Sequence, residues 1–232
     1  NINVTFKNVM ITNGAKQAIY NLFQIMLNEG DEVIIPAPYW LSYPQMVRIS
    51  GGVPVTIDSS PEDGFKIDID ILKSKLTTKT RFIVINTPNN PTGKVFSKKE
   101  LIEILNLLKN NKNLNILSDE IYELILKKDF KHESLASLAD DLRDRVFTIN
   151  GFAKGWAMTG WRVGYLVGKE EVIKASSSLQ SQSTSNVCSF AQRGAIAALQ
   201  IDGKFFDQLN SKYDERRKLL INGIQKINGL YI

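Results

Sequence analysis

Four short polar segments carry the residue types in this sequence that could do chemistry together. They read TNGAK at 12–16, NTPNNPTG at 86–93, SDEIY at 118–122 and NGFAK at 150–154, with MTGWRVGY at 158–165 after the last. The first opens a predicted helix, whose backbone N–H groups and dipole could hold a phosphate. Taken singly, such segments are usually a helix cap, a loop turn or an acid that caps the next helix. They indicate a common site only if the fold brings them together.

The elements that must position these segments alternate between short apolar strands and amphipathic helices. We expect strands at 33–35, 53–57, 82–85, 114–117, 146–149 and 161–167. We expect helices at 15–28, 43–49, 69–76, 98–109, 170–179, 190–200 and 205–226. Ser97 and Glu100 have the spacing of a capping box at the start of the fourth helix. This alternation predicts a three-layer α/β/α domain with a doubly wound, mostly parallel sheet.

Ligands of such sheets bind beyond the carboxyl ends of the strands, and three of the segments follow predicted strands. In this chain order, "PNNPTG", "SDEIY" and "AKxxxMTGWRxGY" resemble the large domain of the class I aminotransferases, which are pyridoxal-phosphate enzymes of fold type I. The resemblance extends over roughly residues 10–209. Within the family, "GAKQAI" followed by "GDEVIIPAPYWLSYP" looks most like the bacterial-type aspartate aminotransferases.

The resemblance implies pyridoxal 5'-phosphate as the cofactor and a catalytic set of Lys154, Asp119 and Tyr122. Lys154 would form the Schiff base with the cofactor and then move a proton between the substrate Cα and the cofactor. Asp119 would pair with the ring nitrogen, and Tyr122 and Asn90 would hydrogen-bond the phenolic oxygen. Arg162 would bind the phosphate through paired hydrogen bonds.

Four further residues are expected at the same site. The backbone N–H groups of Ala15 and Lys16 would assist with the phosphate, Trp40 would stack on the cofactor ring, and Tyr43 would line the same wall. Lys16, Trp40 and Asn90 would also contact the substrate. A lysine at the position of Lys16 is associated in the bacterial aspartate group with the distal carboxylate of the substrate. A solvated lysine at the start of a helix is the alternative interpretation.

Two positions depart from the family pattern. Many relatives carry serines three residues and one residue before the Schiff-base lysine, and this chain has Gly151 and Ala153 there. We therefore expect one hydroxyl contact to the phosphate to be missing.

The sequence predicts an aspartate:2-oxoglutarate aminotransferase with ping-pong kinetics. One alternative is a sibling enzyme for aromatic, alanine or prephenate substrates. Another is a non-catalytic effector domain of a transcription regulator, which keeps the cofactor lysine and carries a DNA-binding segment upstream.

Composition limits the remaining possibilities. The net charge is +5, with basic and acidic residues interleaved, and this pattern does not favour nucleic acid. Cys188 is the single cysteine and His132 the single histidine, so we expect no internal disulfide and no metal site of the Cys/His type. A cytoplasmic homodimer that acts on an amino acid and a 2-oxo acid, without a membrane partner, is the expectation.

Residues 1–232 are expected to form one cofactor-binding large domain that is truncated at both ends. By the resemblance, the small domain with the arginine for the substrate α-carboxylate would follow the chain. An amino-terminal segment that closes over the substrate would precede it.

Overall fold

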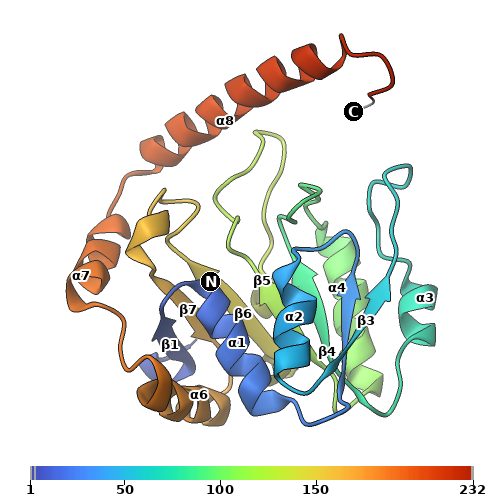
Figure 1. The fold of residues 1–232 in the computed structure, drawn as a ribbon, viewed down its shortest axis with the longest axis vertical. Coiled ribbons are helices and arrows are strands. Elements are labelled where there is room, and N and C mark those ends of the chain that lie inside the picture. Colours follow the sequence, from blue (N-terminus) through green and yellow to red (C-terminus); the bar gives the residue numbers. More distant parts are fainter. Residues whose placement is uncertain (1, 3, 231–232) are drawn as a thin grey trace.

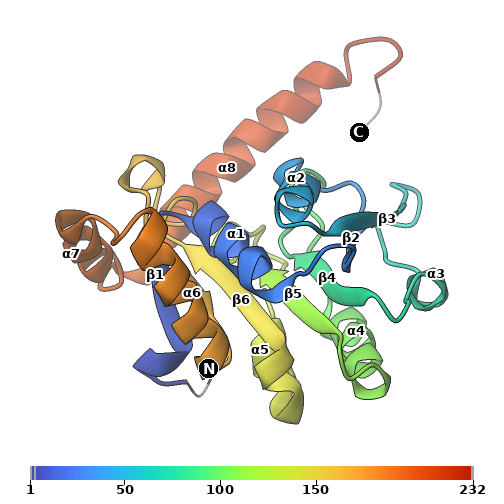
Figure 2. The same cartoon turned by 60° about the horizontal axis from the view of Figure 1, so that its bottom comes forward.

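A single sheet organises the chain, with helices on both of its faces (Figures 1 and 2). The structure is a computed structural model that describes residue 2 and residues 4–230. The sheet has seven strands in the order β1-β7-β6-β5-β4-β2-β3. The strands are β1 (Val9–Thr12), β2 (Glu32–Pro36), β3 (Val53–Ile57), β4 (Thr80–Asn86), β5 (Asn115–Asp119), β6 (Val146–Gly151) and β7 (Gly164–Val167).

The sheet is mixed, and its register decides which polar residues meet. The five adjacent strands β3, β2, β4, β5 and β6 run parallel, whereas β7 is antiparallel to both β6 and β1. Asn86 at the end of β4 pairs with Asp119 at the end of β5. Because parallel strands end at the same edge of the sheet, the segments after β4, β5 and β6 meet there.

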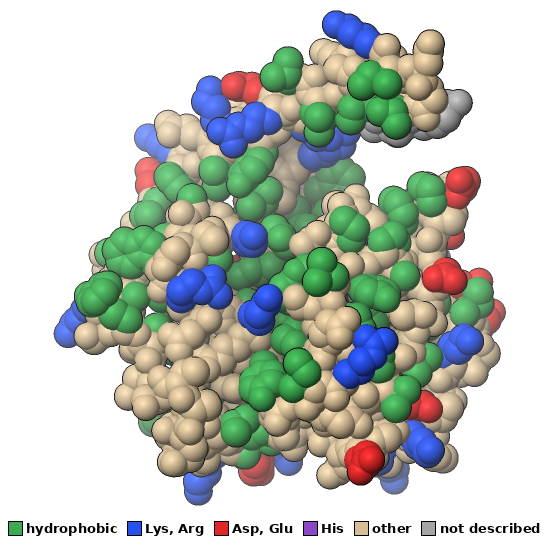
Figure 3. Space-filling view, in the orientation of Figure 1, with side chains coloured by type: hydrophobic (Ala, Val, Ile, Leu, Met, Phe, Trp, Pro, Cys, Tyr) green, Lys and Arg blue, Asp and Glu red, His purple; other side chains and the backbone are tan. Residues whose placement is uncertain are grey.

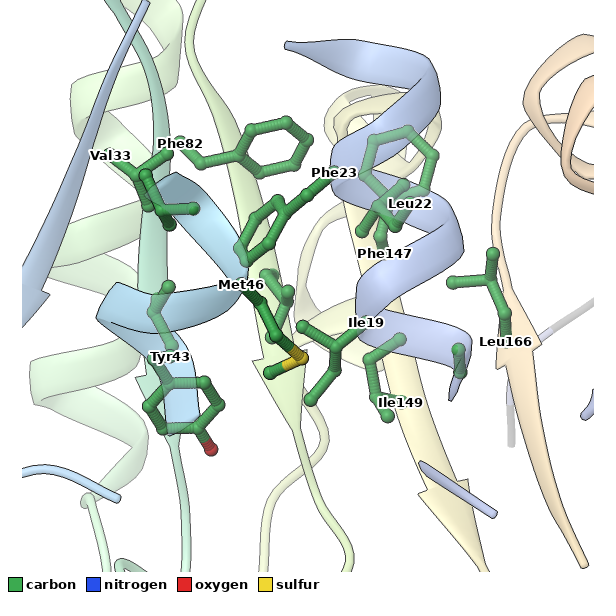
Figure 4. Packing of buried hydrophobic residues seen from close by; sticks show 14 of the residues in the cluster. Ile19, Leu22, Phe23, Val33, Tyr43, Met46, Phe82, Phe147, Ile149 and Leu166 are labelled. Carbon is green, nitrogen blue, oxygen red and sulfur yellow. The ribbon is translucent and has the colours of Figure 1, made fainter. Parts of the chain in front are cut away.

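Two helical layers cover the sheet, as the sequence predicted. One layer contains α1 (Ala15–Met26), α2 (Ser42–Ile49) and α6 (Glu170–Ser183), and the other contains α3 (Ile69–Ser74), α4 (Lys98–Asn110) and α5 (Leu135–Leu138). Val33 and Ile35 of β2 pack toward the first layer, while Ile34 packs toward the second. Side chains alternate across a strand, so a continuous apolar run is buried on both faces. Figure 4 shows the cluster under α1 and α2.

Two helix starts differ in a way that matters for the site. At α4, the Ser97 side chain accepts from the Glu100 N–H and the Glu100 carboxylate accepts from the Ser97 N–H, which confirms the predicted capping box. At α1, the N-cap is Gly14 with φ 83°, and no side chain caps the helix. The Gln17 N–H donates to the Gly14 carbonyl, whereas no side chain caps the Ala15 and Lys16 N–H groups, which can therefore serve another acceptor.

Five further helical segments complete the described part of the chain. They are α7 (Ser189–Ala198), α8 (Gly203–Ile224) and the 3-10 turns η1 (Phe6–Asn8), η2 (Asp140–Arg145) and η3 (Thr159–Trp161). None of the residues of α8 is buried, and Figure 1 shows this helix projecting away from the sheet. In the described part of the chain, no helix combines the length and apolar character needed to cross a membrane.

Several details of the expected elements were wrong; the helix expected at 170–179, for example, extends to Ser183 as α6. The sequence analysis did not predict β1 or α5, which are only four residues long each. The last strand was expected at 161–167, yet β7 begins at Gly164. The reason is local, because Arg162 has φ 54° and ψ 47°, a left-handed conformation that cannot continue a strand.

Candidate active site

A cavity of about 280 Å³ opens at the carboxyl edge of the sheet. It is lined by Ala15, Lys16, Trp40, Tyr43, Asn86, Asn90, Asp119, Ile121, Tyr122, Ala153, Lys154, Thr159 and Arg162. All nine residues that the sequence analysis placed at the site are among them. Figure 3 shows basic side chains around a hollow between α8 and the body of the domain. The linear segments therefore form one site.

Asp119 is the buried anion of the cavity and is only 3% exposed. Its Oδ2 accepts a hydrogen bond from the Tyr43 hydroxyl over 2.6 Å, and its Oδ1 accepts one from the Ile121 N–H over 3.2 Å. Burial raises the pKa of Asp119 to about 6, and the hydrogen bond from Tyr43 opposes that rise. A carboxylate with two donors still has lone pairs for a further cation or N–H group.

Asn86 links the Asp119 backbone to the polar turn that contains Asn90. The sequence analysis did not identify Asn86 as a site residue. Its Nδ2 donates to the backbone oxygen of Asp119 over 3.0 Å, and its Oδ1 accepts from the Asn90 N–H over 2.7 Å. The Asn90 Nδ2 in turn lies 3.5 Å from the Tyr122 hydroxyl. The three asparagines of residues 86–93 were the signal in the sequence for a hydrogen-bonding residue here. Only the pairing of β4 with β5 shows that Asn86 is the one that contacts Asp119.

Lys154 presents its amine on the same side as Tyr122. The Lys154 Nζ lies 5.5 Å from the centroid of the Tyr122 ring. Lys154 follows β6, whereas Tyr122 follows β5, and these two strands are neighbours in the sheet. The Lys154 amine, the Tyr122 phenol and the Asn90 amide therefore lie near one another in the cavity. The Asp119 carboxylate lines the same cavity.

Arg162 lies against the start of α1. Its Nη2 donates to the Asn13 carbonyl over 3.4 Å and its Nη1 donates to the Thr159 carbonyl over 3.1 Å. A Cβ added to Gly14 would collide with the guanidinium, so only glycine allows this approach. A guanidinium at the positive end of a helix is electrostatically unfavourable unless an anion joins them. This end of the cavity therefore suits a phosphate group.

Lys16 and Trp40 form the outer wall. The Lys16 Nζ lies 4.9 Å from the centroid of the Trp40 ring, within the range of a cation–π contact. Trp40 also packs edge-on against Tyr43, with ring centroids 5.3 Å apart. An exposed face of an indole ring is a suitable surface for stacking a flat heterocycle.

The structure gives a steric reason for one departure from the family pattern. A Cβ at Gly151 would lie 2.7 Å from the Gly164 Cα and 2.8 Å from the Val163 oxygen, so a serine there requires the backbone to shift. Thr159 lines the cavity on the same side, and its hydroxyl donates to the Ala153 oxygen over 2.8 Å. The sequence analysis did not single out Thr159.

Glu120, Glu123 and His132 form a second polar cluster behind the cavity, and their potential ligand atoms lie within 4.8 Å of one another. Glu120 already accepts from the hydroxyls of Ser118 and Ser134, over 2.7 Å and 3.1 Å, and lies 3.1 Å from the His132 Nε2. These bonds tie the turn that carries Asp119 to the loop before α5.

The donor set of the cavity fits pyridoxal 5'-phosphate. An amine suits its aldehyde, a buried carboxylate suits its ring nitrogen, and a phenol with an amide suits its phenolic oxygen. The guanidinium at the start of α1 suits its phosphate, and the gap that Gly14 leaves against Arg162 is needed for that arrangement.

Comparisons with known proteins agree with this class of site. The family model for aminotransferase class I and II matches residues 1–232, so the chain belongs to that family. It is 44% identical over 227 residues to a protein of Rickettsia typhi named probable aspartate/prephenate aminotransferase, covering 98% of this chain and 57% of the relative.

Solved structures lead to the same family. The aspartate aminotransferase of Rhizobium meliloti matches with a TM-score of 0.93 and 36% identity, over 97% of this chain and 56% of that one. The Thermus thermophilus aspartate aminotransferase with maleate matches with a TM-score of 0.88 and 40% identity, over 97% and 58%. These matches confirm the predicted fold, and the chain spans a little over half the length of the proteins it matches.

Proposed function

We propose that this chain is the cofactor-binding large domain of an aspartate aminotransferase, which transfers an amino group between aspartate or glutamate and a 2-oxo acid. The observation that carries the proposal is the meeting of Lys154, Asp119 and Arg162 in one cavity at the uncapped start of α1. In the proposed mechanism the two half-reactions follow ping-pong order.

Each residue of the site would have an assigned task, and Lys154 and Lys16 would have two each. When bound, pyridoxal 5'-phosphate supplies an electron sink for the charge that develops at the substrate Cα. Arg162 and the N–H groups of Ala15 and Lys16 hold the phosphate, and Trp40 covers the ring face. Asp119 keeps a proton on the ring nitrogen, since a buried anion favours a neighbouring cation. Tyr122 and Asn90 hydrogen-bond the phenolic oxygen and so keep the ring from rotating.

Lys154 would act through its Nζ in two ways. Its Nζ would hold the cofactor covalently through the aldehyde carbon. The same Nζ would also serve as the base that takes up the proton from the substrate Cα and holds it for transfer. An amine takes up a proton only in its uncharged form.

Lys16 supports a dicarboxylate as the substrate. Its Nζ lies above the Trp40 ring at the outer wall of the cavity, where a substrate side chain would extend. The Thermus relative was solved with maleate, itself a dicarboxylate, which is in keeping with this assignment. The Rickettsia relative is named for both aspartate and prephenate, so prephenate is the second candidate substrate.

The assembly and location belong to the same proposal. We expect a homodimer that works in a reducing cytoplasm and contacts neither nucleic acid nor membrane. The one cysteine, Cys188, is free and exposed, in keeping with a reducing compartment.

The test of this proposal is to load the protein with pyridoxal 5'-phosphate, reduce it with borohydride and map the modified peptide. The adduct should lie on Lys154, and in the full-length protein Lys154→Ala should lose both the adduct and nearly all turnover. Lys174→Ala, on the exposed surface of α6, is the matched control and should keep both. An adduct on any other lysine, or a full-length protein inactive toward aspartate and 2-oxoglutarate, would contradict the proposal.

A further inference from the structure

Tyr43 places a polar group at the edge of the packed core. The residue is 1% exposed and belongs to the apolar cluster beneath α1 and α2. Figure 4 shows its hydroxyl oxygen directed away from the other labelled side chains. That hydroxyl donates to the Asp119 Oδ2 over 2.6 Å, across 76 positions of sequence. The resemblance gave Tyr43 only a place in the cavity wall, and the contact gives it a specific partner.

We propose that Tyr43 is a positioning residue for the cofactor site, whose hydroxyl keeps the Asp119 carboxylate ionised and fixed in orientation for the cofactor's ring nitrogen. The inference rests on the proposed function, because it requires a ring nitrogen opposite Asp119.

The electrostatics of the pair support this role. Burial raises the pKa of Asp119, and the negative charge of Glu120, next in the chain, raises it further. The Tyr43 hydrogen bond and the Ile121 N–H both lower it. Burial and the neighbouring Asp119 raise the pKa of Tyr43 itself well above its ordinary value, so the phenol stays protonated as the donor. Of the two donors, only the Tyr43 hydroxyl can be removed by a side-chain substitution.

The geometry makes Tyr43 a rigid donor. Its ring packs edge-on against Trp40, and the two residues lie at the start of α2 and just before it. Trp40 is the residue that we assign to the face of the cofactor ring. Residues 40–43 would therefore act on that ring twice, directly through Trp40 and indirectly through the bond from Tyr43 to Asp119. A donor fixed by core packing loses little entropy when it holds the carboxylate.

The experiment compares two cofactors in wild type and Tyr43→Phe. Both proteins are titrated with pyridoxal 5'-phosphate and with its 1-deaza analogue, in which a C–H group replaces the ring nitrogen. The wild type should bind the natural cofactor more tightly, because Asp119 recognises the nitrogen. In Tyr43→Phe this preference, the ratio of the two Kd values, should fall roughly tenfold, as expected for a lost hydrogen bond to a charged group.

Tyr20→Phe is the control, because Tyr20 packs against the same cluster from α1. It should leave the ratio of the two Kd values unchanged. If Tyr43→Phe weakens both cofactors equally, Tyr43 serves packing alone and the inference is overturned.

Infrared spectra of the cofactor-free proteins give a readout that does not depend on binding. At neutral pH, Tyr43→Phe should show more protonated carboxylic acid than the wild type, and the added Asp119→Asn substitution should remove that band. An unchanged band would overturn the inference. If the wild type fails to bind pyridoxal 5'-phosphate at all, the proposed function fails, whereas an unchanged Kd ratio in a wild type that binds it overturns only the role of Tyr43.

Discussion

At the scale of single residues, the burial of Asp119 opposes the ionised form that the proposed cofactor contact requires. A buried carboxylate is needed to hold a proton on a ring nitrogen, yet burial disfavours its charged form. The pKa of Asp119 in the folded chain is about 6, above the ordinary value of 3.8. The folded state therefore holds a proton that the unfolded state releases between these two values.

This difference predicts how stability depends on pH in the absence of cofactor. The contribution of Asp119 is fully present below about pH 4 and is lost as the pH rises through about 6. A shift of about two pKa units corresponds to about 3 kcal/mol in the free energy of unfolding. Asp119→Asn should remove this loss between pH 4 and 7, as measured by denaturant titration.

Asp58→Asn, at an exposed carboxylate, is the control for removal of a negative charge. Parallel pH profiles for the wild type and Asp119→Asn would show that burial does not raise the pKa of Asp119.

Lys16 is the residue through which substrate choice can be tested. In the full-length enzyme, Lys16→Ala should lower kcat/KM for aspartate and leave alanine nearly unchanged. The loss of a charge-assisted hydrogen bond of roughly 1.5–3 kcal/mol implies a decrease of about ten- to more than a hundredfold. Equal losses for both amino acids in steady-state assays would assign Lys16 to the phosphate loop or to the fold.

At the scale of elements, the buried parallel strands could be predicted from local sequence, whereas the short edge strand β1, which depends on a distant partner, was missed. Residues 82–85 and 114–117 lie within β4 and β5 or at most one residue outside them, because a buried parallel strand is a local run of apolar residues. By contrast, β1 is an edge strand of four residues that pairs only with β7, far along the chain. No local pattern encodes that pairing.

The same distinction applies to the site. Asp119 and Lys154 could be predicted to meet, because Asp119 ends β5 and Lys154 follows β6 at the same edge of the sheet. Arg162 was placed with them by the resemblance alone, since it precedes β7 and does not directly follow a strand. The contact from Tyr43 to Asp119 and the bridge through Asn86 could not be predicted. They depend on how α2 docks and on the β4–β5 register, which are properties of the packed molecule.

The approach of β7 to the start of α1 yields a prediction about an element. A Cβ at Gly164 would lie 2.5 Å from the Ala15 nitrogen and the Gly14 carbonyl carbon, both backbone atoms that no rotamer change can move. Gly164→Ala should therefore destabilise the fold by about 1–3 kcal/mol and weaken cofactor binding by displacing the uncapped helix start. Denaturant midpoints and cofactor titrations measure both effects.

Gly160→Ala is the matched control, since a Cβ at Gly160 would have no heavy atom within 4 Å. If the two variants behave alike, the contact between β7 and the start of α1 does not constrain the phosphate site.

At the scale of the whole molecule, the last helix lies outside the cavity lining, although it packs on segments next to the cavity: Asn210 bonds the backbone of Leu124 and Leu126, and Phe206 contacts Trp156. The cavity residues lie between Ala15 and Arg162, whereas α8 begins at Gly203. α8 exposes Leu219 and Leu220, at 76% and 63%, and contributes nothing to the cavity lining. Cofactor capture should therefore be a property of the sheet and of the segments at its carboxyl edge.

The last prediction is that the 232-residue chain alone binds pyridoxal 5'-phosphate but does not transaminate at a useful rate. The basic residues that line the cavity, Lys16, Lys154 and Arg162, already have tasks, so none remains for the substrate α-carboxylate. The chain also spans only 57% of the Rickettsia relative. Substrate positioning and water exclusion each lower a barrier by several kcal/mol, so without them only slow chemistry remains. Titration with cofactor, followed by assays with aspartate and 2-oxoglutarate beside the full-length enzyme, measures both properties. Comparable turnover by the two proteins would show that residues 1–232 suffice for the whole reaction, and the proposed division between cofactor capture and substrate capture would be wrong.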